Sequence, residues 1–292
     1  MKILIIELHG ADPGALFGDE RLANIRRLME GGCYGRLTRS PTLGNDAAPA
    51  TTLIRDAVAL QGKGVVLVGV SLVDPPREPN IICVGCRLAR GAGSETYTHP
   101  PEVTQQISSL VGEYPAEVED VGDDAQLHEA ICAAARTNFE LAWHFMQHSQ
   151  WDCFHFAERG FDLLHRRRSA ELIGNYFAQL DEGIGGLLEL LSDDTAILIV
   201  SESDASGARE AGREGVGGGC FILAAPSNPL QEELQGVSVH DLAPTLLELS
   251  GYTIPAGRPG KSLVAWKTVA APEAEDPEAL LRARLRGLGY IE

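Results

Sequence analysis

Residues 195–207 read TAILIVSESDASG, and this stretch decides the fold class. Residues 196–200 are branched aliphatics in a run too short for a helix, which is typical of a buried strand in a parallel sheet. The run ends abruptly in acidic and hydroxyl residues at 201–206. In open α/β sheets the carboxyl ends of strands face the ligand crevice, so these side chains could hold a metal or polarise a substrate. A polar loop that caps the next helix is the alternative.

Working outward, apolar runs alternate with helical stripes along the whole chain. The apolar runs predict strands at residues 2–8, 33–37, 65–73, 80–84, 151–156 and 220–224. Helical periodicity predicts helices at residues 22–29, 51–60, 101–110, 124–148, 169–191 and 240–249, the last with Asp241 as its N-cap. Residues 87–101 are rich in Gly and Thr and are expected to form an exposed loop. This alternation predicts a three-layer α/β/α sandwich with a mostly parallel central sheet.

Composition narrows the function classes. The chain has 292 residues with 41 acidic and 24 basic side chains, a formal net charge of −17. This balance argues against non-specific binding to nucleic acid or to an anionic membrane. No apolar run is long enough to span a bilayer. The apolar start is followed at once by Glu7 and His9, so it is expected to be a strand and not a signal peptide. We therefore expect a cytoplasmic location.

We expect a single α/β domain over residues 1–270, followed by an acidic linker and a C-terminal helix over residues 271–292. The six cysteines lack the density of a disulfide scaffold. Cys83 and Cys86 form a C-x-x-C without a second pair at zinc-finger spacing. A structural zinc there is one interpretation, and reduced, partly buried thiols are the favoured one.

Several segments, taken in order, resemble the alkaline phosphatase superfamily, specifically its type I phosphodiesterase/nucleotide pyrophosphatase branch, which is related to the sulfatases. The matching segments are residues 8–12 (LHGAD), 22–29 (LANIRRLM), 32–35 (GCYG), 97–120, 139–142 (FELA), 151–152 (WD), 239–247 (VHDLAPTLL) and 284–290 (RLRGLGY). The resemblance covers most of the chain and implies an alkaline-phosphatase-like fold.

The resemblance also implies an activity. Members of this superfamily use two divalent metals, usually zinc, and a Thr or Ser nucleophile to cleave phosphate esters. The nucleophile normally lies two residues before the Pro of a T-x-P-A segment. Residues 48–51 read APAT, which places Ala47 at the nucleophile position. A chain without that hydroxyl lacks the covalent route.

The metal positions implied by the resemblance are partly replaced. His9 stands where the first strand normally ends in an Asp ligand, and Asp162 matches the Asp of a later motif. The His expected four residues after Asp162 is replaced by Arg166, while His165 lies one residue earlier. Arg166 could place a fixed positive charge where a metal would bind, or it could belong to a solvated charged face.

The motif after the apolar run at 196–200 offers Glu202 or Asp204, depending on register, but loses its His in either case. The final His is replaced within a glycine run at residues 215–219. The candidate metal ligands are therefore His9, Asp162, His165, Glu202 and Asp204. A closed zinc site needs three or four ligands, so two adjacent sites cannot be completed from this set without further recruits.

Three hypotheses follow. The first is a pseudoenzyme that keeps the fold and binds a phosphate- or sulfate-containing small molecule or a protein partner, without a metal. The second is a diverged phosphoester or sulfate-ester hydrolase that uses one zinc or other divalent metal and a water nucleophile. The third is a non-catalytic interaction subunit. The fold-level resemblance alone does not choose among them, because function depends on the site.

Overall fold

The structure is a computed structural model that describes residues 1–38, 49–72, 74, 76, 78–90, 93–112, 114, 118, 122–167, 169–201, 219–226, 228, 230–257 and 259–264. Within these ranges, it does not describe the side chains of residues 89, 90, 93–96, 162, 166, 167 and 170. The expected linker and C-terminal helix at 271–292 lie outside the described residues.

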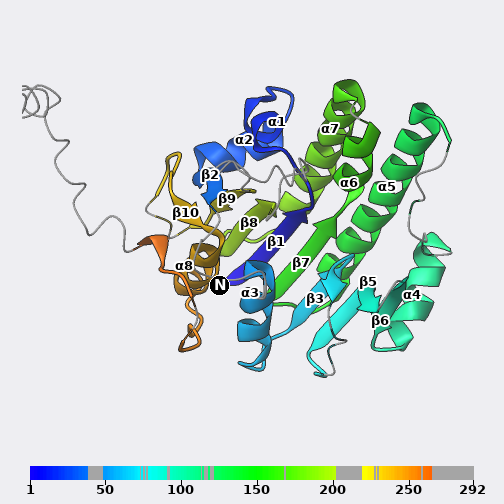
Figure 1. Ribbon diagram of the computed structural model, residues 1–292. Helices are drawn as coiled ribbons and strands as arrows, with labels where there is room; N and C mark the ends of the chain where they lie inside the picture. The colour runs from blue at the N-terminus through cyan, green and yellow to red at the C-terminus, as the bar shows by residue number, and fades with distance from the viewer. Residues whose placement is uncertain are drawn as a thin grey trace, which may run out of the picture.

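A ten-stranded sheet forms the centre of the molecule (Figure 1). Its order is β10-β2-β9-β8-β1-β7-β3-β5-β4, with β6 added beside β5. The strand bounds are β1 Lys2–Leu8, β2 Cys33–Thr38, β3 Val65–Val68, β4 Ser71–Leu72, β5 Ile81–Arg90, β6 Gly93–His99, β7 Cys153–Glu158, β8 Thr195–Ser201, β9 Cys220–Ala224 and β10 Val237–Ser238. The opening stretch of the sequence analysis thus supplies β8, which lies parallel to β1 in the middle of the sheet.

The sheet is mostly parallel, as predicted. β1 is parallel to both β7 and β8, and β3 is parallel to both β7 and β5. The antiparallel neighbours lie toward the two edges, where β9 pairs with β8 and β2, and β6 pairs with β5. The mixed α/β sandwich expected from the sequence is therefore confirmed.

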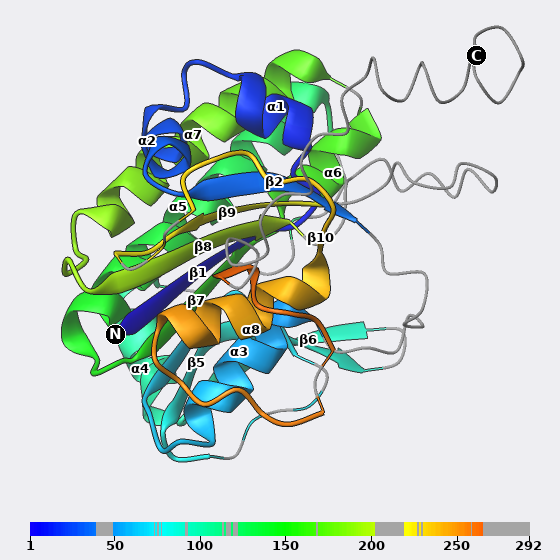
Figure 2. The same ribbon diagram turned by 90° about the vertical axis from the view of Figure 1, so that its left-hand side faces the viewer.

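Two layers of helices cover the sheet (Figures 1 and 2). Helices α1, α2, α4, α5, α6 and α7 contribute to the core on one face, and α3 and α8 contribute to the core on the other. The helix bounds are α1 Pro13–Gly18, α2 Ala23–Glu30, α3 Ala50–Ala59, α4 Glu102–Val111, α5 Asp124–His148, α6 Gly160–Arg167, α7 Ala170–Leu188 and α8 Val239–Leu249.

Successive side chains of a strand point to opposite faces, and β1 shows how this divides the two cores. Leu4, Ile6 and Leu8 pack in the core under α5 and α7. Ile3 and Ile5 pack in the core under α3 and α8. The alternation places the Glu7 side chain on the α3 and α8 face, where it is the polar member of an otherwise apolar row.

The predicted exposed loop at residues 87–101 is wrong. β5 continues to Arg90 and forms an antiparallel hairpin with β6. Cross-strand pairing satisfies the backbone of this Gly- and Thr-rich segment, and Thr and Tyr are good strand formers. The single strand expected at 65–73 is divided into β3 and β4 at Gly69, whose φ of 68° breaks the extended conformation.

The prediction that Asp241 is the N-cap of the last helix is also wrong. Ser238 is the N-cap of α8, and Asp241 occupies the third helical position of a capping box. The Asp241 carboxylate accepts hydrogen bonds from the backbone N–H of Ser238 (2.9 Å) and of Lys261 (2.8 Å). It thereby ties the segment after α8 to the start of the helix.

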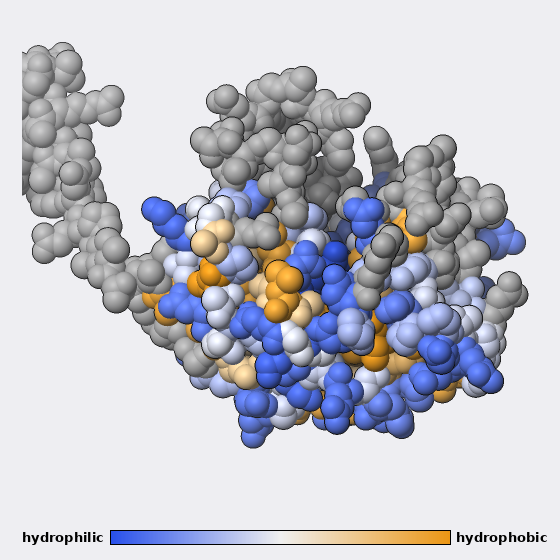
Figure 3. Space-filling model, turned by 90° about the horizontal axis from the view of Figure 1, so that it is seen from below, coloured by the Kyte–Doolittle hydropathy of each residue, from blue (hydrophilic) through white to orange (hydrophobic). Residues whose placement is uncertain are grey.

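All six cysteines are free and buried, which agrees with the favoured reading of reduced thiols. The hydrogen bond with Cys86, together with burial, raises the pKa of the Cys83 thiol. Across the part of the chain that the structure describes, no helix combines the length and apolarity needed to cross a membrane. The face formed by the amino ends of the strands is largely polar, with separate small apolar areas (Figure 3).

Candidate functional site

Two polar residues interrupt the apolar rows of β1 and β7 near the carboxyl ends of these strands. Ile5 is the register partner of His155, so Glu7 lies two residues further along the neighbouring strand. Both side chains face α3, and both residues are buried. His155 Nε2 lies 2.9 Å from Glu7 Oε2 and makes a hydrogen bond with it. A carboxylate–imidazole pair therefore lies in the core between the sheet and α3.

The charges around this pair favour an ionised Glu7. Burial raises the pKa of Glu7, but the hydrogen bond from His155 and the positive charge of Arg159 outweigh burial and lower the pKa to about 2. Burial lowers the pKa of His155 despite the Glu7 carboxylate. Because His155 is fully buried, we assign a neutral His155 that donates a hydrogen bond to an ionised Glu7.

His9 lies against the other oxygen of the same carboxylate. Its Nε2 is 3.2 Å from Glu7 Oε1, within ion-pair distance, and its side chain is 22% exposed. The ring nitrogen is not aligned for a hydrogen bond, however, and counts among the buried polar atoms without such a partner. Glu7 therefore contacts two imidazoles, one buried and one that reaches the surface.

Two arginines add positive charge to this end of the sheet. Arg159 follows β7, and its guanidinium donates a hydrogen bond to the Ser71 hydroxyl in β4. Its charge acts on Glu7, while the charge of Arg55 in α3 acts on His155. The Arg55 side chain is 13% exposed and its Nε lies 3.4 Å from the Asp56 carboxylate.

Besides His9 Nε2, two buried polar atoms in this region have no hydrogen-bond partner among the described residues. They are Nη1 of Arg55 and Nδ1 of His155. A neutral His155 that donates through Nε2 presents Nδ1 as an acceptor, whereas Arg55 Nη1 can only donate. Buried unpaired groups cost free energy, so a bound water or polar ligand atom beside them would be stabilised.

His165 reaches the same end of β1 from helix α6. Its Nε2 lies 3.0 Å from the carbonyl oxygen of Gly10. A carbonyl oxygen only accepts, so this nitrogen carries the hydrogen and donates it. His9 and His165 are both predicted ligands. His165 is hydrogen-bonded to the backbone of Gly10, the residue that follows His9 in the sequence.

A second buried carboxylate fixes the turn from which α6 begins. Glu158 accepts hydrogen bonds from the Tyr176 hydroxyl (2.7 Å), the backbone N–H of Arg159 (3.0 Å) and of Gly160 (3.2 Å), and the Asn138 amide (3.2 Å). A side chain at Gly160 would collide with Tyr176, since an added Cβ would lie 2.4 Å from its hydroxyl. This network holds Arg159 and the start of α6 in place.

The remaining predicted site residues are not placed by the structure. Asp162 and Arg166 belong to α6, but their side chains are not among those described. Ala47, Glu202 and Asp204 lie outside the described residues. Of the five proposed metal ligands, the structure describes the side chains of two, His9 and His165, whose Nε2 atoms have different neighbours.

These two histidines do not form a metal centre with their described neighbours. His165 Nε2 is committed to a carbonyl oxygen, and His9 Nε2 faces Glu7. Within the described ranges, no three His, Cys, Asp or Glu side chains gather as a metal site requires. The described side chains therefore do not complete a metal site by themselves.

Sequence reasoning missed Glu7, His155, Arg55 and Arg159. A signal was present, because Glu7 and His155 each interrupt a run of apolar residues. A polar residue inside a buried strand needs a partner, which makes such an interruption informative. The identity of the partner depends on the register between β1 and β7, which the sequence does not state.

Comparisons with solved structures relate this architecture to known folds. The chain is similar to the phosphonate monoester hydrolase from Silicibacter pomeroyi, at 13% identity and a TM-score of 0.56, covering 94% of this chain and 78% of that one. It is similar to a proposed sulfatase from Bacteroides fragilis, at 15% identity and a TM-score of 0.52, covering 94% and 79%. It is also similar to Ps i-CgsB bound to a neocarrahexaose, at 15% identity and a TM-score of 0.52, covering 91% and 76%.

No family model matches the sequence, and no curated protein matches it either. At these identities the structural likeness establishes the fold and leaves the chemistry to the residues. Proteins described as sulfatases and phosphonate monoester hydrolases are among the solved structures that share this fold.

Proposed function

We propose that this protein binds a phosphate or sulfate ester at the carboxyl ends of β1 and β7 and no longer performs two-metal hydrolysis. The observation that carries the proposal is the charge arrangement around Glu7. His9 and Arg159 act on the Glu7 carboxylate, and Arg55 acts on its partner His155. In a chain of net charge −17, the guanidinium groups of Arg159 and Arg55 near these imidazoles are suited to an anion.

The loss of hydrolysis is supported by the sequence. Ala47 occupies the nucleophile position, and the final His position falls in a glycine run at 215–219. The structure adds that His165 Nε2 donates to the Gly10 carbonyl. These features favour a site that holds an ester over one that cleaves it.

Titration calorimetry with inorganic phosphate, inorganic sulfate and AMP tests the binding. Arg159→Gln is expected to weaken anion binding by about tenfold or more, because a charge-assisted hydrogen bond to the anion is lost. Arg27→Gln is the matched control, since Arg27 is an exposed residue in the last turn of α2, which leads into the amino end of β2 at the opposite end of the sheet. Equal binding by both variants, or none by the unaltered protein, would refute an anion site here.

A second candidate function is a single-metal hydrolase, and it is favoured by the position of His165, which contacts the backbone of the residue that follows His9. Elemental analysis and assays of a phosphate diester and an aryl sulfate with added Zn²⁺ or Mn²⁺ separate the two proposals. Turnover that Asp162→Ala abolishes would establish hydrolysis. Anion binding without turnover would support the first proposal.

The finer relationship that we propose is to the phosphodiesterase/nucleotide pyrophosphatase branch, and it rests on the shared order of several segments from residues 8–12 to residues 284–290. It predicts that AMP binds more tightly than a sulfated sugar. The structural neighbour Ps i-CgsB binds a neocarrahexaose, so the reverse preference would indicate a sulfatase-like site. The free, buried thiols suit a reducing compartment, and we assign the protein to the cytoplasm, which cell fractionation would test.

A further inference from the structure

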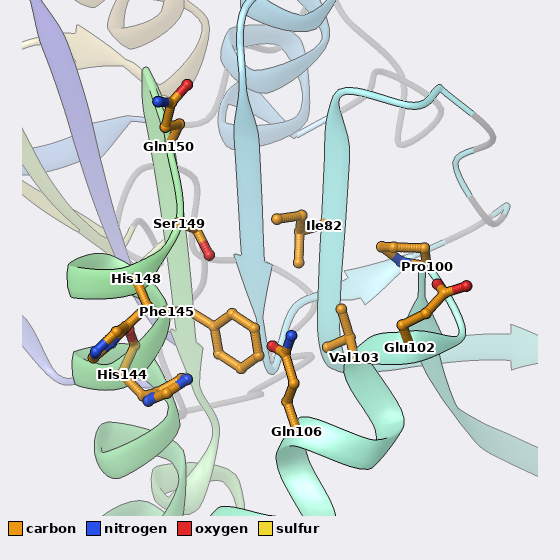
Figure 4. Close-up of a pocket in the computed structure, with 10 residues that line it drawn as sticks. All are labelled: Ile82, Pro100, Glu102, Val103, Gln106, His144, Phe145, His148, Ser149 and Gln150. Carbon is orange, nitrogen blue, oxygen red and sulfur yellow. The ribbon is translucent and has the colours of Figure 1, made fainter.

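A cavity of about 370 Å³ lies at the opposite end of the sheet from Glu7, between α4 and the last turns of α5 (Figure 4). Phe145 points between the two helices and faces Val103. Both of these side chains are buried. Polar side chains form the rim, with His144 and His148 from α5 and Glu102 and Gln106 from α4.

His144 and His148 are four residues apart and lie on the same side of α5, one turn from each other (Figure 4). Their rings stack with centroids 4.3 Å apart and an interplanar angle of 19°. Imidazoles at this helical spacing are the arrangement by which H-E-x-x-H helices hold zinc. His148 is exposed, so an ion from solvent can reach its ring.

The protonation of His148 suits a ligand. Its Nδ1 lies 2.9 Å from the His144 carbonyl oxygen, which only accepts, so Nδ1 carries the hydrogen. The lone pair is therefore on Nε2, which faces away from the helix backbone. Histidines that bind metals commonly donate their other ring N–H to a backbone carbonyl in this way.

The surroundings also favour a cation. His148 is the last residue of α5, and the carboxyl end of a helix carries partial negative charge. Glu102 lies across the cavity from the two histidines and is not one of their partners (Figure 4).

We propose that His144 and His148 form a two-imidazole site for a divalent first-row transition ion such as Zn²⁺ or Ni²⁺ at the mouth of this cavity. Imidazole is a favoured ligand of these ions. Within the described ranges no third His, Cys, Asp or Glu joins the pair, so water or a cavity ligand completes the coordination. The site is separate from the residues of the anion proposal and does not depend on it.

Calorimetric titration of the metal-stripped, full-length protein with ZnCl₂ and NiCl₂ tests the site. We expect micromolar binding of one ion at this site. His144→Ala and His148→Ala are each expected to weaken it by more than about tenfold, because either change leaves a single imidazole. Gln147→Ala is the matched control, since Gln147 is exposed in the same helical turn and is expected to leave binding unchanged.

Two further variants locate the ion. His128 pairs with Cys132 at the same spacing elsewhere on α5, with its Nε2 3.6 Å from the thiol, and His9 marks the opposite end of the sheet. His128→Ala and His9→Ala are expected to retain the binding. Binding only at millimolar metal, binding that survives either change at 144 or 148, or binding lost in the His128 or His9 variant would overturn the proposal. Circular dichroism of each variant checks that the fold is intact.

Discussion

At the scale of single residues, Glu7 shows how a buried charge is kept in an apolar sheet. Its carboxylate contacts His155 at 2.9 Å and His9 at 3.2 Å, and the resulting interactions lower its pKa from 4.5 to about 2 although burial raises it. A lowered carboxyl pKa means that the unfolded chain binds protons more readily than the folded chain. Glu7 therefore stabilises the fold above pH 4.5 and loses that effect as pH falls toward 2.

His155 acts in the same direction at higher pH. Burial lowers its pKa below 6.5, so its protonation disfavours the folded state as pH falls below that value. We therefore predict a free energy of unfolding that declines from pH 7 downward, first through His155 and then through Glu7. The Glu7 contribution lost on acidification is roughly 2–3 kcal/mol. Urea unfolding at several pH values measures this decline.

Glu7→Gln isolates the carboxylate. At pH 7 it is expected to lower the free energy of unfolding by ~1–3 kcal/mol, because His155 loses a charged acceptor in the core. The variant's free energy of unfolding should also depend less on pH below pH 4.5. Glu129→Gln, at an exposed position of α5, is the control and should leave both unchanged. If the free energy of unfolding of the Glu7 variant still falls as steeply below pH 4.5, other carboxylates are responsible for that fall.

Tyr176 tests the second buried carboxylate. Its hydroxyl donates to Glu158 at 2.7 Å, and its ring is fully buried. Tyr176→Phe removes one donor from an enclosed acceptor and is expected to cost ~1–3 kcal/mol in unfolding free energy. Tyr252→Phe removes a weaker hydrogen bond of 3.2 Å to the Met1 carbonyl at a half-buried site and should cost less. Equal losses would show that Glu158 finds a replacement donor.

At the scale of elements, α7 packs through glycines. An added Cβ at Gly183 would lie 2.6 Å from the Phe139 ring of α5, closer than carbon atoms can approach. Gly183→Ala removes a poor helix former, which alone favours the helix by ~1 kcal/mol. Overpacking against Phe139 costs ~1–3 kcal/mol, so we expect a net loss of stability in urea unfolding.

Gly18→Ala is the control for this effect. Gly18 ends α1, and no atom lies within 4 Å of its added Cβ. The change should alter the free energy of unfolding by no more than ~0.5 kcal/mol in either direction. A neutral result at Gly183 would mean that Phe139 can rotate away, and that α5 and α7 do not depend on this close approach.

The elements differ in how far their sequence could predict them. The bounds of α5 match the expected residues 124–148, because a long periodic stripe begins at a strong N-cap, Asp123. α1 was not predicted, since its six residues are too few to show a helical period. The β5–β6 hairpin was mistaken for a loop, because its stability comes from cross-strand pairing rather than from an apolar run.

The candidate site was predictable only in part for a similar reason. His9 and His165 are predicted as ligands from the resemblance, and the structure places the His165 ring against the carbonyl of Gly10, the residue after His9. The pairing of Glu7 with His155 joins residues 148 positions apart and depends on strand register. Arg55 belongs to α3, which packs on the same face of the sheet as Glu7 and His155. No local pattern in the sequence predicts this placement.

At the scale of the whole molecule, the two cores share one sheet. β1 supplies Ile3 and Ile5 to one core and Leu4, Ile6 and Leu8 to the other, so neither core can form without the central strands. Every strand and both cores lie within residues 1–264. We therefore expect a chain that ends at residue 264 to fold as one cooperative unit.

Truncation after residue 264 tests this expectation of a single domain. The shortened chain should keep its near-ultraviolet circular dichroism, and its single urea transition should shift by no more than ~1 kcal/mol, because the sequence predicts that residues 271–292 are an acidic linker and a helix outside the domain. Truncation after residue 238 is the contrasting control, since it removes α8 and with it the buried side chains of Leu242, Leu246 and Leu247. Deleting those side chains should abolish cooperative unfolding, as burial of each contributes ~2 kcal/mol. A large loss of stability on removing residues 265–292 alone would instead assign that segment to the folded domain.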